Sequence, residues 1–149
     1  MKGYYRFPTI FKNQIVFVSE DDIWSVTIDN PRAVRLTANI SQVSTPLLSP
    51  NGKWIAYVGR EDGNTEVYII PSIGGISKRL TFDGAFINKI AGWKNDSEII
   101  YASDMKQAFS RISDLRKVNI KGGESEALNY GIASLCQNIA KLFICIALH

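Results

Sequence analysis

Short apolar runs, each bounded by turn-forming residues, recur three times along this 149-residue chain. The runs start at Ile15, Ile55 and Ile99, and equivalent positions of the three copies lie 40 to 48 residues apart. A repeat of that period built from strand-like segments is typical of the blades of a β-propeller. The equivalent positions are an aromatic residue, a carboxylate and a closing triplet: Phe17, Tyr57 and Tyr101; Asp22, Glu66 and Asp114; Arg35-Leu36-Thr37, Arg79-Leu80-Thr81 and Ala127-Leu128-Asn129.

Each copy is predicted to fold as four short antiparallel strands joined by tight turns. Turn residues mark the third-to-fourth connections at Asn30-Pro31, Gly74-Gly75 and Gly122-Gly123. The second strands are continuously apolar, which indicates a sheet covered on both faces, as in a blade between two neighbours. The expected strands are 6–10, 15–19, 22–28 and 33–37, then 43–49, 54–60, 65–71 and 76–81, then 86–93, 98–103, 113–120 and 124–129.

The predicted fold class is therefore all-β: a partial β-propeller of about three four-stranded antiparallel blades with an incomplete fourth. The blades are expected at about residues 4–38, 42–82 and 85–129, and the region 1–134 would include the start of a fourth blade. Propellers have about four to eight blades, and closure removes their exposed sheet edges. We therefore expect the end blades to be covered by the remaining blades of a larger protein or by another copy of this chain.

Residues 135–149 diverge from the repeat and leave two interpretations open. The apolar segment 142–146 lies about one period after Ile99 and would form an inner strand of the fourth blade. The other interpretation is a truncated or out-of-frame tail, and the absence of the expected polar turn favours it.

Aromatic residues at matched positions are predicted to pack rather than to bind a ligand. Phe17, Tyr57 and Tyr101 would each fill the space between adjacent blades. The three tryptophans (Trp24, Trp54 and Trp93) could form a stacking surface, but their places on or beside strands favour core or interface packing.

Composition narrows the class of protein further. Apolar residues make up 46% of the chain and charged residues 21%, as in soluble globular proteins. The net charge is +3, and the basic residues are dispersed, so neither a nucleic-acid partner nor a membrane partner is expected. The start of the chain has no signal-peptide pattern, and the longest apolar run, residues 142–148, is shorter than the roughly 20 residues of a membrane helix. The two cysteines, Cys136 and Cys145, read as buried small hydrophobes, which indicates a cytoplasmic protein.

No catalytic, cofactor-binding or metal-binding residue is predicted. The single histidine, His149, is the last residue, and a serine nucleophile needs a nearby base. The carboxylate run Glu20-Asp21-Asp22 could hold a cation, but the preferred interpretation is a solvated turn. The Gly-Gly pairs lack the lysine spacing of a phosphate-binding loop and read as hairpin turns.

Several segments resemble the N-terminal region of the tricorn protease family, over about residues 1 to 134. They are 4–10, 15–24, the Ser-Pro-Asn-Gly-Lys turn at 49–53 with 54–57, the Lys-Arg-Leu-Thr segment at 78–81, the Met-Lys-Gln-Ala-Phe-Ser loop at 105–110, and 128–134. Tricorn proteases are large cytoplasmic, hexamer-forming serine peptidases that cleave peptides released by the proteasome. The resemblance implies a six-bladed propeller, a seven-bladed propeller and then a PDZ-like and catalytic region. The adjacent arginines that hold the substrate carboxylate in that family have no counterpart here, because no two arginines are adjacent.

The resemblance implies a non-catalytic fragment: the opening blades of a tricorn-type propeller, not an enzyme by itself. The alternative is a stand-alone TolB-like interaction module, made whole by dimerisation into six blades. An independent enzyme is the least favoured interpretation. Partners would be the remaining blades or a second copy, with peptides as ligands of the full-length family.

Overall fold

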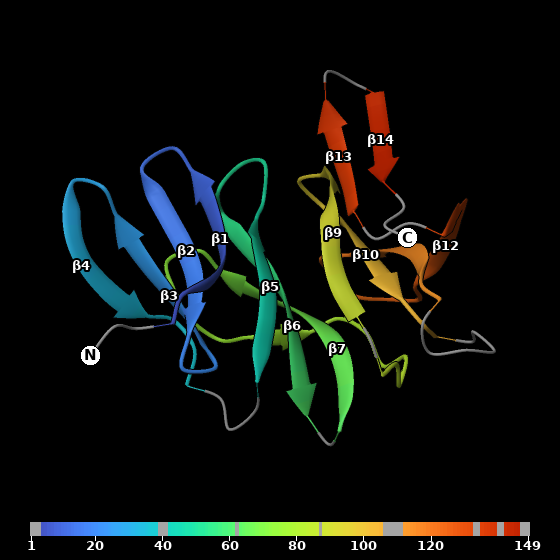
Figure 1. Ribbon diagram of the computed structural model, residues 1–149, viewed down its shortest axis with the longest axis horizontal. Coiled ribbons are helices and arrows are strands. Elements are labelled where there is room, and N and C mark those ends of the chain that lie inside the picture. Colours follow the sequence, from blue (N-terminus) through green and yellow to red (C-terminus); the bar gives the residue numbers. More distant parts are fainter. Residues whose placement is uncertain are drawn as a thin grey trace.

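The structure is a computed structural model that describes residues 4–38, 42–61, 63–86, 88–105, 112–132, 135–139 and 142–146. These residues form three four-stranded antiparallel sheets and one two-stranded sheet, with no helix among them. The three larger sheets stand side by side in an open arc (Figure 1). The predicted all-β fold with three four-stranded blades is confirmed.

Strands within each blade pair in chain order. The first blade contains β1 (Arg6–Phe11), β2 (Gln14–Ser19), β3 (Asp22–Thr27) and β4 (Asn30–Arg35). The second contains β5 (Val43–Leu48), β6 (Trp54–Glu61), β7 (Asn64–Pro71) and β8 (Lys78–Arg79). The third contains β9 (Asn88–Asn95), β10 (Glu98–Ser103), β11 (Asp114–Asn119) and β12 (Glu126–Ile132).

The first strands of successive blades lie next to one another, which is the arrangement of a propeller around its axis. β1 contacts β5, and β5 contacts β9, without forming a common sheet. A hairpin of β13 (Leu135–Ile139) and β14 (Leu142–Ile146) continues the series, because β13 lies against β9 (Figure 1). Its backbone register places Cys136 opposite Cys145. The hairpin thus stands where the first strands of a fourth blade would be; the burial of its side chains lies outside the described residues.

Two of the three matched aromatic residues fill the blade interfaces. Tyr57 is fully buried between the first and second blades, in a cluster with Val16 and Ile23. Tyr101 is fully buried between the second and third blades, in a cluster with Val58. Burying a large aromatic side chain contributes about 1.5–3 kcal/mol, so these two residues are principal contributors to the interfaces. The interface-filling prediction is correct for both.

The third matched aromatic residue, Phe17, lies on the free face of the first blade. Val16 and Ile23 point into the cluster with the second blade, so Phe17 and its cross-strand partner Trp24 lie on the opposite face. Phe17 is only partly buried, and Tyr5 meets it edge-on with ring centroids 5.2 Å apart. The residue type that fills the other interfaces therefore has no neighbouring blade here among the described residues.

The tryptophans divide in the same way. Trp93 is 7% exposed and donates a hydrogen bond from Nε1 to the Leu47 carbonyl of the neighbouring blade at 3.2 Å. Trp54 is partly buried and packs against the cluster that contains Trp93 and Tyr101. Trp24 is partly buried on the free face of the first blade and donates from Nε1 to the Ser19 carbonyl.

The closing Arg-Leu-Thr triplets form an Arg-acid-Thr clasp that fastens the third strand of the first two blades. In the second blade, Arg79 Nη2 lies 2.9 Å from Glu66 Oε1, and Thr81 Oγ1 donates to Glu66 Oε2. The Thr81 hydroxyl also accepts the Val67 amide at 2.9 Å. Glu66 is 1% exposed, so these donors stabilise a carboxylate that would otherwise be costly to bury.

The first blade repeats the clasp, and the third blade does not. Arg35 pairs with Asp22, and Thr37 Oγ1 donates to Asp22 Oδ1 at 2.8 Å. Asp22 is 4% exposed. The preferred interpretation of residues 20–22 as a solvated turn is therefore wrong for Asp22, which begins β3 as a buried group. In the third blade Ala127 and Asn129 stand at the arginine and threonine positions, so the guanidinium and the hydroxyl group of the clasp are missing from these positions.

The outer strands differ most from their predicted bounds. β4 spans residues 30–35 rather than 33–37, so Asn30-Pro31 belongs to the strand and the turn lies at residues 28–29. β8 has two residues rather than six. β12 begins and ends two to three residues later than expected. In the first two blades, the end of the triplet leaves the sheet because its threonine bonds to the buried carboxylate.

The innermost strands of the first two blades carry a matching bulge. Phe7 has a φ of 51° and Thr45 a φ of 46°, and the strand register shifts at both points. A positive φ is rare for a β-branched residue. At Thr45 the bulge is used, because its Oγ1 accepts the Ile90 amide of the next blade at 3.1 Å.

Candidate functional site

The candidate functional site lies where the third strand of one blade departs from the repeat. Trp24 and Tyr68 pair across the sheet with Phe17 and Tyr57, so two blades carry an aromatic pair. In the third blade the residue opposite Tyr101 is Arg116. A guanidinium therefore faces the second blade where the repeat would place another ring.

Arg116 is held by a hydrogen-bonded network that joins the two blades. Its Nη2 donates to the Ser125 carbonyl and, like Nε, to Ser125 Oγ, at distances of 3.0 to 3.1 Å. Ser125 Oγ donates in turn to Asp83 Oδ2 at 3.2 Å. Tyr101 donates its hydroxyl to the same oxygen at 2.6 Å. The network holds the Arg116 side chain in place, and the groups that bind it directly belong to the uncharged Ser125.

The electrostatics of this network act on the buried tyrosine. Burial raises the pKa of Tyr101 well above its usual value, and the hydrogen bond to the Asp83 carboxylate raises it further. Tyr101 is therefore a neutral hydrogen-bond donor over the physiological pH range. It keeps Asp83 oriented toward Ser125 and Arg116.

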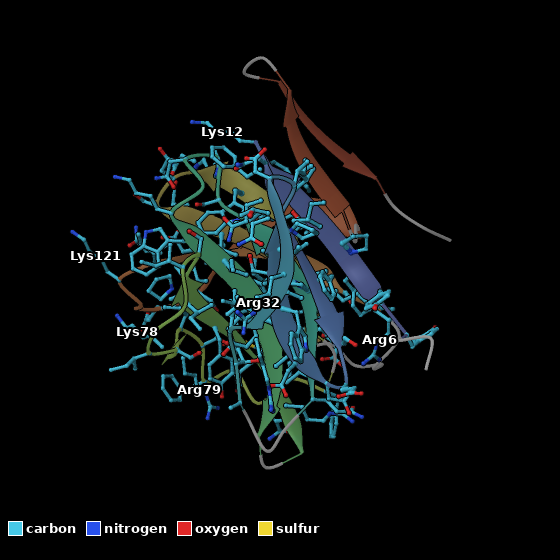
Figure 2. All side chains as sticks on the ribbon, turned by 90° about the vertical axis from the view of Figure 1, so that its left-hand side faces the viewer. Arg6, Lys12, Arg32, Lys78, Arg79 and Lys121 are labelled. Atoms are coloured by element: carbon cyan, nitrogen blue, oxygen red, sulfur yellow. The ribbon has the colours of Figure 1, made fainter. Side chains whose placement is uncertain are left out.

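A groove of about 840 Å³ opens above this network, between β8 of the second blade and the β11–β12 side of the third. Residues 78–83 form one wall, and residues 121–125 form much of the other. Lys78 crosses the groove at one end, where its Nζ donates to the Lys121 carbonyl at 2.5 Å. Figure 2 shows Lys78 and Lys121 together on one flank of the molecule, with Arg79 below them. β8, which begins the first wall, is only two residues long, and residues 80–83 continue that wall outside the strand.

The lining of the groove is predominantly basic. Lys78, Arg79, Arg116 and Lys121 line it, against the carboxylates of Asp83 and Glu124. Arg79 is neutralised by the buried Glu66 below it. Within the described part of the chain, Arg116 makes no ion pair. A partly buried guanidinium that only serine restrains retains its capacity to bind an anion.

One exposed ring adds an apolar surface to this charge. Phe82 is 76% exposed and lines the groove, with the Arg79 guanidinium 4.4 Å from its ring centroid. The site thus combines a predominantly basic region with an apolar platform. Such a combination suits a ligand that carries both a carboxylate and a hydrophobic group.

The corresponding interface between the first and second blades is packed differently among the described residues. Tyr68 stacks on Tyr57 there, with ring centroids 5.5 Å apart. The hollow near that interface measures about 200 Å³. In the next interface Arg116 stands in place of the aromatic residue, and the groove beside it is the larger of these two spaces.

The residues that the sequence analysis considered as possible functional residues contribute little to this groove. His149 lies outside the described residues. Residues 122–123 form the β11–β12 turn, where Gly122 donates its amide to the Asn119 carbonyl at 2.8 Å, and they line the groove only as backbone. Among the residues that the structure describes, no cluster of three or more His, Cys, Asp or Glu residues could hold a metal ion.

The residues that form the groove were missed by the sequence analysis. Arg116 was counted among the dispersed basic residues, although it stands two positions after Asp114. Trp24 and Tyr68 stand at the same spacing after Asp22 and Glu66. Alignment of the repeats at this position would have shown a charge in place of a ring. The Asp83 partner carries no such signal, because it follows the clasp in a loop.

Comparisons with known proteins identify the family to which this architecture belongs. The chain is an open arc of β-propeller blades: its residues 2–140 match the family model described as the tricorn protease N-terminal β-propeller domain. It is 34% identical over 135 residues to a tricorn-like protease N-terminal subunit of Sulfurisphaera tokodaii, covering 88% of this chain and 68% of that protein. The chain belongs to the tricorn protease family, in the part that forms the N-terminal propeller.

The chain spans only a small part of the length of the longer relatives that it matches. It is 36% identical over 129 residues to tricorn protease homolog 1 of Streptomyces coelicolor, covering 87% of this chain but 12% of that protein. The crystal structure of the tricorn protease superposes with a TM-score of 0.87 at 22% identity, covering 97% of this chain and 15% of that chain. A TolB structure from Agrobacterium tumefaciens superposes with a TM-score of 0.73 at 17% identity, covering 90% of this chain and 50% of that chain, and shares the fold.

Membrane insertion through a helix finds no support in the described residues. None of them belongs to a helix with the length and apolar character that a membrane span requires.

Proposed function

We propose that this chain supplies the opening blades of the N-terminal propeller in a cytoplasmic tricorn-type serine peptidase that degrades peptides downstream of the proteasome. The chain itself is non-catalytic in this proposal. Membership of the tricorn N-terminal propeller family supports it. The peptidase activity would reside in a further catalytic region.

The observation that carries the proposal is the free face of the first blade. Phe17 stands at the position that Tyr57 and Tyr101 fill within closed interfaces, yet it is only partly buried. Its partner Trp24 is partly buried on the same face. A face with the composition of a blade interface is suited to receive another blade. We therefore expect the remaining blades of the peptidase to be its partner.

The test is recovery of the assembly from the source cells through an affinity tag on this chain. The expected result is a complex whose other polypeptides, identified by mass spectrometry, carry further propeller blades and a serine peptidase region. That complex should hydrolyse the peptides of a proteasome digest. Phe17→Arg should abolish recovery of the complex, because it places a charge in the blade interface, while the matched control Arg32→Gln on the exposed β4 should leave it unchanged.

A different result would favour a stand-alone TolB-like module. Recovery of the chain only as a homodimer, without a peptidase polypeptide, would overturn the proposal in favour of six blades made from two copies. Light scattering of the recovered protein measures its mass, and so distinguishes a homodimer of this chain from a complex with a peptidase polypeptide.

A further inference from the structure

We propose that the groove between the second and third blades binds an acidic peptide segment in extended conformation. The proposed ligand places a carboxylate at Arg116 and an apolar side chain on Phe82. This inference deepens the proposed function, on which the choice of a peptide as ligand partly rests. The groove itself is argued from this chain's own contacts.

The first argument is the preorganisation of the guanidinium. Arg116 is fixed by three hydrogen bonds to Ser125, which is itself fixed by Asp83. The other arginines of known pairing, Arg6, Arg35 and Arg79, each face a carboxylate. A guanidinium that is already restrained, and that makes no ion pair within the described residues, binds a carboxylate with little further loss of side-chain entropy.

The second argument is the shape of the groove. Residues 78–83 form a continuous wall of six residues on one side. An extended chain rises roughly 3.3 Å per residue, so an extended peptide of a few residues would fit along that wall. A volume of about 840 Å³ is in the range of ligand sites, which run from roughly 300 to 1,000 Å³.

The third argument is the distribution of charge along that wall. Lys78 and Lys121 stand together at one end (Figure 2), where Lys78 donates a hydrogen bond to the Lys121 carbonyl. Arg116 lies deeper in the groove, and Phe82 lies on the wall. Two anionic side chains separated by an apolar one match this order. Successive side chains of an extended peptide point to opposite sides, so alternation of acidic and apolar residues directs the acidic side chains to one side and the apolar side chains to the other.

The experiment is a calorimetric titration of the full chain with two blocked tetrapeptides, one alternating leucine and glutamate and one with glutamine in place of glutamate. The acidic peptide should bind, and the glutamine peptide should bind at least about tenfold more weakly, because charged hydrogen bonds are lost. Glutarate and inorganic phosphate serve as free anions. If either binds as tightly as the acidic peptide, the groove is a small-anion site and the peptide assignment is overturned.

Variants locate the site. Arg116→Tyr restores the aromatic type of the other blades and should weaken binding of the acidic peptide by about tenfold or more. Lys78→Gln together with Lys121→Gln should weaken it by a few-fold and increase its tolerance of salt, because exposed charges act through screened attraction. Because both lysines are exposed, the double lysine variant is expected to fold normally. It therefore tests the site even if Arg116→Tyr reduces folding. Arg32→Gln is the matched control, and unchanged binding in both groove variants would overturn the proposal.

The binding test is independent of assembly. A chain that binds the acidic peptide but recovers no peptidase polypeptide overturns only the proposed function. A recovered peptidase complex whose propeller chain does not bind the peptide overturns only the groove assignment.

Discussion

The interface between the first and second blades is closed by aromatic rings, whereas the interface between the second and third combines a ring with charges and an open groove. Tyr57 and Tyr68 stack in the first interface. In the second, Tyr101 faces Arg116, and the neighbouring space reaches about 840 Å³. Both interfaces use the same strands of the same repeat. The two interfaces thus differ in the residue type on the third strand, which is aromatic in one (Tyr68) and basic in the other (Arg116).

The largest effect is expected from removing the ring that closes the first interface. Tyr57→Ala should lower the free energy of unfolding by about 3–5 kcal/mol, because a fully buried aromatic residue leaves a cavity between two rigid sheets. Urea unfolding followed by circular dichroism measures this loss, and the exposed Tyr4→Ala is the control. A loss below about 1 kcal/mol would show that the ring does not hold the blades together.

The next effect contrasts the two kinds of arginine. Arg79→Ala should cost about 2–3 kcal/mol, because it leaves Glu66 buried without its cation, and the partial exposure of Arg79 moderates the loss. Arg116→Ala should cost less than about 1 kcal/mol, because Ser125 and Asp83 remain bonded to each other. Both are measured by urea unfolding. Equal costs would remove the distinction between a clasp arginine and a groove arginine.

A smaller effect is expected at the turn where the first blade touches the second. Gly52 has a φ of +71°, and a Cβ there would lie 2.2 Å from the Phe11 ring. Gly63 has a φ of +86°, with no atom within 4 Å of such a Cβ. Gly63→Ala should therefore cost about 1 kcal/mol from backbone strain alone, and Gly52→Ala about 1–2 kcal/mol more from contact. Thermal unfolding of the pair measures the difference, and equal shifts would contradict the contact with Phe11.

The smallest effect concerns alkaline pH at the second interface. The pKa of Tyr101 is raised in the folded chain, so its contribution is fully present below about pH 10 and is lost as pH rises further, when the unfolded chain ionises first. Stability should fall by up to about 1.4 kcal/mol per pH unit from this residue. Tyr101→Phe should flatten this decline between pH 10 and 11. An unchanged slope in the variant would show that Tyr101 does not bind its proton more tightly after folding.

Sequence patterns predicted the inner parts of the blades better than the outer parts. The bounds of β10, residues 98–103, were correct because both faces of that strand are buried and its apolar run is continuous. β4 is exposed along its whole length, so hydrophobic periodicity gave no signal for its ends. The Arg-Leu-Thr triplets were assigned to the ends of the fourth strands, predicted at residues 33–37 and 76–81. Their threonines instead leave the sheet to bond to a buried carboxylate.

The groove depended on information that a single pattern does not carry. Arg116 could have been recognised from the repeat, since its counterparts are Trp24 and Tyr68. Its partners could not, because Asp83 and Ser125 belong to different blades and meet only after the blades stack. The length of β8 likewise followed from tertiary contacts rather than from local propensity.

Neighbouring blades in the described residues share no sheet; their seams consist mainly of interlocked side chains and bonds such as that from the Ile90 amide to the Thr45 hydroxyl. A blade can therefore be gained or lost in a gene without disturbing the strand ladder of the blade beside it. What must match at such a junction is a patch of side chains. The junctions between blades thus depend on complementary side chains and not on a strand ladder that runs from one blade into the next.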